Sequence, residues 1–224
     1  LSDVDKRMVQ MFYITIWGKA IENWEDDEVL DNIYSLSDSP VLLSELIALL
    51  EYNYNRIDFI DETVDIGFNC PLDLHCTYTR DQLLVAMDFM KPNTVREGVK
   101  WLPEKEIDVF FVTLNKSDKD YSPTTMYNDY SINEILFHWQ SQSTTNADGQ
   151  VGQRYINHKK NGSRVLLFVR EFKSDVYGNT APYTYLGIAN YVSHNGSRPM
   201  NVTWQLEKAI PAKYLKKTNK LVVG

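Results

Sequence analysis

Long apolar runs are absent from this sequence, and none approaches the roughly 18 residues of a membrane-spanning helix. Cysteine is scarce: Cys70 and Cys76 are too few for the disulfide framework of a small secreted domain. The first residues, Leu1-Ser2-Asp3, include no initiator methionine and no signal-peptide pattern. From these absences we expect a piece of a longer cytoplasmic protein that has no contact with a membrane.

Motifs of common enzyme classes are also missing. The sequence contains no P-loop, no G-x-G-x-x-G fingerprint and no G-x-S-x-G nucleophile elbow. Cys70, His75 and Cys76 lie close together, but their spacing matches no zinc pattern and a fourth ligand is missing. We therefore expect no metal, no cofactor and no catalytic activity in this chain.

What the sequence does contain is an uneven distribution of charge. Residues 1–100 carry 8 Lys and Arg against 19 Asp and Glu, whereas residues 150–224 carry 12 against 3. This split predicts an acidic N-terminal part beside a basic, anion-binding part. Basic surfaces often bind nucleic acid, although a solvated basic surface with a basic tail is the alternative.

Helical patterns dominate the N-terminal part. Residues 4–17 and 24–36 are expected to form helices, and Ser39-Pro40 can begin a third helix with a stripe of leucines. We expect a helical lead-in or linker domain over residues 1–70 and a second domain over residues 71–224.

Strand-like segments dominate the second domain. EIDVFFVTLNK (106–116) predicts a strand, and Asn161-Gly162 predicts a hairpin turn within residues 153–173. Residues 183–194 and 200–206 should pair through another Asn-Gly turn. We predict an α+β fold, in which the helical N-terminal part precedes a small, mostly antiparallel β-barrel or curled sheet.

Two capping-box patterns predict helix starts in the same domain. Thr79-Arg80-Asp81-Gln82 should begin a helix near residue 80. Ser131-Ile132-Asn133-Glu134 should begin one or two helical turns that lead into FHWQSQSTTN (137–146).

FHWQSQSTTN is unusual because it combines aromatic and amide side chains with no charged residue. On a strand, His138, Gln140 and Gln142 would share one face and Trp139 the other. A Gln amide matches the edge of a base and a Trp offers a stacking plane, as a pocket for an extruded base requires. The alternative is a core Trp139 with Gln side chains that bond to loop backbone.

The expected hairpin tip is basic. His158, Lys159, Lys160 and Arg164 surround Asn161-Gly162, and such a tip could follow a phosphate backbone or remain a solvated turn. Arg170 is a further candidate, but it alternates with two Phe residues and could instead be a buried structural arginine.

A nuclease site is another reading of the same region. Glu171 and Lys173 lie two apart after an apolar strand. With an upstream acid such as Asp108 or Asp129, they resemble the Asp…Glu-x-Lys metal site of restriction-type nucleases.

The sequence also resembles a known family. The segments that carry the resemblance are LDLHCTYTRDQLLVAM, VFFVTLNKSDKDYSPTTMYNDYSINEILFHWQSQS, VLLFVRE and YTYLGIANYVSHNGSRPMNVTWQL. They look like an uncharacterised domain at the C-terminal end of bacterial DEAD/DEAH-type superfamily 2 helicases. These helicases often carry a phospholipase-D-like nuclease domain and belong to restriction or phage-defence proteins. The similarity runs from about Pro71 to Pro211.

The resemblance implies a role in sensing nucleic acid beside the helicase core and nuclease domains of the same polypeptide, and it supplies no catalytic residues. The barrel is PUA-like by analogy alone, and PUA-like folds include readers of modified bases. We therefore predict a module that reads DNA, with a modified or flipped base as its target. A protein-docking or regulatory domain of the helicase is the alternative. The pocket residues would be Tyr127, Asp129, His138, Trp139, Gln140 and Gln142, and the phosphate contacts would be Lys159, Lys160, Arg164 and Arg170.

Overall fold

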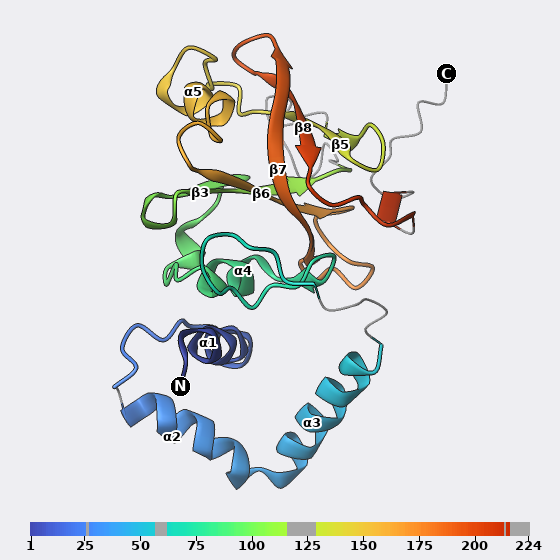
Figure 1. Ribbon diagram of the computed structural model, residues 1–224. Helices are drawn as coiled ribbons and strands as arrows, with labels where there is room; N and C mark the ends of the chain where they lie inside the picture. The colour runs from blue at the N-terminus through green and yellow to red at the C-terminus, as the bar shows by residue number, and fades with distance from the viewer. Residues whose placement is uncertain (26, 57–61, 116–128, 213, 216–224) are drawn as a thin grey trace.

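A computed structural model describes the chain except residues 26, 57–61, 116–128, 213 and 216–224. A curled sheet forms one half of the molecule, and helices α1, α2 and α3 form the other (Figure 1). The α+β class and the order of helical part and sheet are therefore confirmed.

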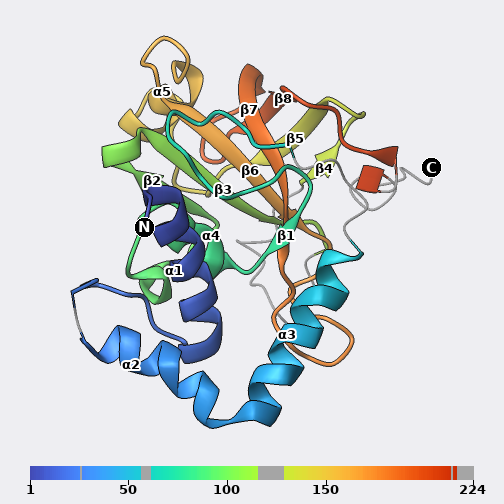
Figure 2. The ribbon, with the colours of Figure 1, turned by 60° about the horizontal axis from the view of Figure 1, so that its bottom comes forward.

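The N-terminal helices follow the sequence patterns closely. They are α1 (Asp3–Trp17), α2 (Asp27–Ser35) and α3 (Pro40–Tyr54), with the 3-10 turn η1 (Leu36–Asp38) before α3. A capping box begins α1, and Pro40 occupies the first turn of α3. Figure 2 shows that α2 and α3 form an arm beside α1. In the described part of the chain, no single helix is long and apolar enough to cross a membrane. The segments Glu28–Asp38 and Pro40–Tyr54 reach the required length and apolar character only when taken together, and a bend of 97° separates them.

Helix α1 packs on α4 (Arg80–Ala86), which covers one face of the sheet (Figure 1). The guanidinium of Arg7 binds the Asp88 carboxylate at 2.8 Å and the carbonyl of Asn69 at 2.7 Å. Thr79 and Gln82 form the capping box that the sequence predicts at the start of α4. In the described residues, the N-terminal helices thus contact the second domain (residues 71–224, called the sheet domain below) mainly through α1.

Eight strands form one mixed sheet in the described residues. They are β1 (Thr77–Tyr78), β2 (Val99–Leu102), β3 (Ile107–Thr113), β4 (Tyr130–Ser131), β5 (Leu136–Gln140), β6 (Arg164–Arg170), β7 (Tyr183–Asn195) and β8 (Asn201–Leu206). The order is β2-β3-β6-β7-β8-β5-β4, with β1 also paired to β7. Among these eight described strands, only β3 and β6 pair in parallel. The 3-10 turns η2 (Pro92–Thr94) and η3 (Pro103–Lys105) flank β2.

The long strand β7 gives the sheet its curl. It pairs with β6 in its first half and with β8 in its second half, and the register shifts in both ladders. Such bulges bend a strand and increase its twist. The sheet formed by the described residues does not close, so of the two expected forms they show the curled sheet and not the closed barrel.

Two local predictions in this domain are wrong. Residues 150–156 form helix α5 (Gln150–Ile156), so Asn161-Gly162 lies in the turns between α5 and β6 and does not join two strands. The reason is tertiary: β6 takes β3 and β7 as its neighbours, which leaves no edge for a hairpin partner. The second wrong prediction is the pair of helical turns expected to begin at Ser131, because this residue lies in strand β4. The turn that follows is closed by Asn133, whose Oδ1 accepts bonds from two backbone amides.

The predicted hairpin of β7 and β8 is confirmed, with Gly196 at φ 75° in its turn. Two apolar clusters make up the core of the sheet domain. One lies between the sheet and α4, and the other lies inside the curl, where Tyr155 of α5 meets Phe110, Trp139 and Trp204. Gly152 lets α5 pack against the loop that precedes it, because a Cβ there would lie 2.2 Å from the carbonyl oxygen of Asn146.

Candidate nucleic-acid interface

Trp139, the aromatic residue at the centre of the predicted base pocket, lies in the core. Only 4% of it is exposed. Its ring stacks on Phe110 with centroids 4.2 Å apart and meets Tyr155 edge-on at 5.6 Å. Alternation along β5 turns Phe137 and Trp139 inward together. The core alternative is therefore correct for this residue, and Trp139 offers no face on which a base could stack.

The polar members of the predicted pocket lie outside the curl and bond mainly to the protein. His138 stacks on Tyr130 with centroids 4.8 Å apart, and the Gln140 amide donates to Asn201 at 3.1 Å. Asp129 is buried, and its carboxylate accepts a bond from the backbone of Gln140 at 2.9 Å.

Of the two remaining pocket candidates, the structure describes Gln142. Gln142 lies beyond the end of β5 and donates to Glu97 at 2.8 Å. Tyr127 lies outside the described residues. The five described candidates therefore do not gather on one face of the sheet.

The two arginines of the predicted phosphate set are held within the fold. Arg170 donates to Thr113 at 2.9 Å and to the carbonyl of Ala181 at 3.2 Å, and its guanidinium lies over the ring of Tyr183. This placement matches the structural role left open for it. Arg164 is half-buried, with its guanidinium against the backbone of Gly67.

His158 is buried and not part of a basic tip. Its Nε2 accepts a bond from the backbone amide of Tyr191 at 3.0 Å, and its Nδ1 faces the carbonyl of Ser163 at 3.3 Å. Both contacts are satisfied by a neutral ring protonated on Nδ1. Burial lowers the pKa of His158.

We expect His158 to make the fold acid-sensitive. Its lowered folded-state pKa means that the unfolded chain binds more protons as the pH falls below about 6.5, so stability decreases there. The slope from one such group is at most about 1.4 kcal/mol per pH unit. Urea unfolding of the wild type and of His158→Gln, at about pH 7.5 and about pH 5.5, measures it. The variant should lose less stability between the two pH values.

Part of the pH dependence should persist in that variant, because burial also lowers the pKa of His75. Equal losses in wild type and His158→Gln would show that His158 does not contribute.

An open groove runs along α5, at a place that the sequence reading assigned to a strand. Its volume is about 630 Å³. Glutamine and asparagine side chains line it together with two cations and an indole, and no acid is among the described lining residues: Trp101, Gln150, Gln153, Arg154, Asn157, Lys160 and Asn161. The pattern Gln-x-x-Gln-x-x-x-Asn, at helical spacing on one face, was the signal that could have found it.

The amides of the groove are organised by one another. The Asn157 side chain donates to the side-chain carbonyl of Gln153 at 3.0 Å, and the Gln153 amide donates to the backbone of Ala147 at 3.0 Å. Gln150 is exposed at the first turn, while Lys160 and its neighbour Lys159 are exposed beyond the last turn. The groove thus presents amides along its length and positive charge at one end.

Arg154 connects the groove to the core. Its guanidinium forms a bidentate pair with Asp108 at 2.7 and 2.9 Å and lies over the ring of Trp101 at 4.4 Å. Asp108 is fully buried on β3. Burial raises the pKa of the Asp108 carboxyl, and the hydrogen bonds from Arg154 oppose that rise. The pair fixes α5 against the sheet.

The described residues do not assemble the alternative nuclease site. Asp108 lies opposite Val165 in the parallel β3–β6 pair, six positions before Glu171, which is about 20 Å at roughly 3.3 Å per residue. Its carboxylate is also occupied by Arg154. Asp129 is buried against the backbone of Gln140. No group of three His, Cys, Asp or Glu in the described residues is placed to hold a metal ion.

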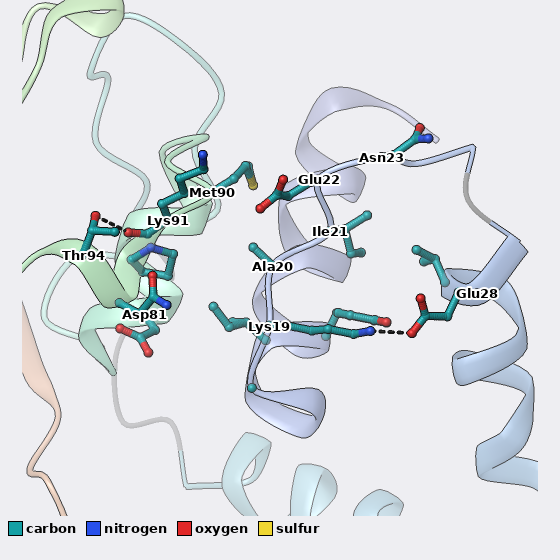
Figure 3. Close-up of a pocket in the computed structure, with 16 residues that line it drawn as sticks. Lys19, Ala20, Ile21, Glu22, Asn23, Glu28, Asp81, Met90, Lys91 and Thr94 are labelled. Carbon is teal, nitrogen blue, oxygen red and sulfur yellow. Dashed lines mark hydrogen bonds and ion pairs between the residues drawn. The ribbon is translucent and has the colours of Figure 1, made fainter.

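A second cavity, of about 580 Å³, lies between α1 and η2 (Figure 3). Acids and lysines both line it: Lys19 pairs with Glu28 on one side, while Lys91 and Asp81 lie on the other. The mixed charge gives this cavity no preference for an anionic ligand, so the α5 groove is the better candidate interface.

Comparison with known proteins adds the family. None of the curated proteins compared with the chain matches it. The model of one family, described as "Domain of unknown function (DUF3427)", matches residues 72–217. This match covers more than half of the chain and confirms the expected resemblance to an uncharacterised domain, which spans the sheet domain and α5. The chain belongs to the DUF3427 family.

Proposed function

We propose that this chain is a non-catalytic module that recognises DNA and that it reads the duplex along α5. The observation that carries the proposal is the acid-free groove, in which helically spaced amides lie beside an exposed lysine pair. Gln and Asn amides match the donor and acceptor edge of adenine in the major groove, which admits a helix. The seven residues of α5 span roughly 10 Å, enough for about three base pairs.

The lysine pair and the amide side chains would have different tasks. Lys159 and Lys160 would bind phosphates, which gives affinity without sequence preference. Gln150 and Asn157 would contact base edges and carry the preference. Burial of Trp139 favours edge reading over capture of a flipped base, because a flipped base needs a stacking surface.

The setting of this module is also part of the proposal. The resemblance to C-terminal domains of superfamily 2 helicases suggests that the module serves the helicase core and nuclease domains of one cytoplasmic defence protein. By analogy with PUA-like folds, a modified base is the target to test first.

Charge reversal at the end of α5 tests the phosphate contacts. We expect Lys159→Glu/Lys160→Glu to weaken binding of every duplex and to lower the slope of log affinity against log salt by about 2, because two phosphate contacts are lost. Fluorescence anisotropy with a labelled duplex at several salt concentrations measures the slope.

The matched control is Lys91→Glu/Lys173→Glu, which makes the same charge change at exposed lysines outside the groove. Equal slopes in the two double variants would show that long-range charge alone acts. Gln150→Ala/Asn157→Ala should leave the slope unchanged and reduce discrimination between duplexes. If it leaves discrimination unchanged, α5 does not read bases.

A further inference from the structure

Helix α3 is apolar and almost entirely uncovered. None of its 15 residues is buried. Figures 1 and 2 show it standing clear of α1 and of the sheet. Leu43 and Leu46 are partly buried. Its other large apolar side chains are between 47% and 75% exposed, and these are Val41, Leu42, Ile47, Leu49, Leu50, Tyr52 and Tyr54. A helix that is apolar on every side is normally buried, and soluble monomers rarely expose a contiguous apolar patch of more than a few hundred Å².

The apolar surface continues onto the preceding helix. Leu30 and Tyr34 lie one turn apart on α2 and are 54% and 70% exposed. Together α2 and α3 form the bent arm below α1 (Figure 1), here called the α2–α3 arm (residues 27–54). The two helices therefore form one apolar surface that could bind a partner.

The charge of the arm narrows the choice of partner. The arm contains six Asp and Glu and no Lys or Arg. An anionic membrane would be repelled by this acidic segment, and so would a second copy, since a twofold interface brings the same acids together on both sides. A basic protein surface would be attracted.

We propose that the α2–α3 arm binds a protein partner that offers an apolar groove or helix face bordered by Lys and Arg. The leucines supply the buried contact area, and the acids set the orientation and accelerate encounter. The arm and α5 lie at opposite ends of the molecule (Figure 1), so the arm can be occupied while α5 is bound to DNA.

Two synthetic helical peptides of about 18 residues test the proposal, one amphipathic with Leu and Lys and one with Leu and Glu in place of Lys. The full chain should bind the Leu/Lys peptide at least about tenfold more tightly in fluorescence anisotropy, and added salt should reduce the difference. Ile47→Gln/Leu50→Gln should weaken binding by about tenfold without lowering the melting temperature, because neither side chain is buried.

Charge exchange provides the matched variant. Glu45→Lys/Glu51→Lys keeps every leucine and should shift the preference toward the Leu/Glu peptide. Equal binding of both peptides, or binding of neither, overturns the proposal. A dimer in sedimentation equilibrium that Ile47→Gln/Leu50→Gln dissociates would identify a second copy as the occupant. Binding to neutral phosphatidylcholine vesicles that the same variant abolishes would identify a membrane.

Discussion

Replacement of Trp139 with alanine is expected to lower the free energy of unfolding by about 3–5 kcal/mol, as truncation of a buried aromatic residue does. The ring is 4% exposed and packs against Phe110, Tyr155 and Trp204, which together close the inside of the curl. Removing it leaves a cavity that β5 and α5 cannot both move to fill. Urea unfolding at equilibrium measures the loss.

The same variant distinguishes a core residue from a base-stacking residue. Under conditions where Trp139→Ala is still folded, it should bind plain and modified duplexes as the wild type does. Trp139→Phe keeps an aromatic ring and should lose less stability. Normal stability of Trp139→Ala together with selective loss of binding to modified DNA would contradict the core assignment.

Arg154→Met is expected to cost about 3–5 kcal/mol of stability, because it leaves the carboxylate of Asp108 buried without a cation. Asp108 is fully buried, and its opposing charge is the Arg154 guanidinium, which donates two hydrogen bonds of 2.7 and 2.9 Å to the carboxylate. Methionine retains much of the side-chain volume against Trp101, so the loss reports mainly on the charge. Urea unfolding again gives the value.

The double variant Asp108→Val/Arg154→Met is the control for that prediction. With both charges removed, most of the stability should return, since apolar replacement of a buried pair is often neutral. Arg154→Lys should not restore the full stability, because an ammonium group cannot form the bidentate pair. If the stability losses of Asp108→Val alone and Arg154→Met alone simply add in the double variant, the ion pair is not the reason for the effect.

Local patterns in the sequence were reliable where neighbours along the chain decide the structure. The capping box at Thr79 begins α4, Pro40 begins α3, and an Asn-Gly pair turns β7 into β8. These features depend on hydrogen bonds and backbone angles within a few residues. The α+β class followed from the helix and strand patterns, whereas the curl of the sheet comes from the pairing of β7 with both β6 and β8.

Contacts between distant segments decided what the sequence left open. An Asn-Gly pair fits any turn that needs a positive φ, so Asn161-Gly162 could not show that α5 and not a strand precedes it. The position of β3 excludes the strand. β3 pairs in parallel with β6 across more than 50 residues of sequence and occupies the edge that a hairpin would need.

The candidate site differs from the predicted one because contacts between distant segments decide which side chains are buried. The sequence determined which residue types alternate along β5, and it correctly separated Trp139 from His138 and Gln140. It could not determine which face is inside, because both faces of that strand carry aromatic or ring side chains. Closure of the curl around Phe110 and Tyr155 put Trp139 in the core and set the amides of α5 beside Trp101 on the surface. Burial is a property of the assembled sheet, and only the tertiary structure could assign it.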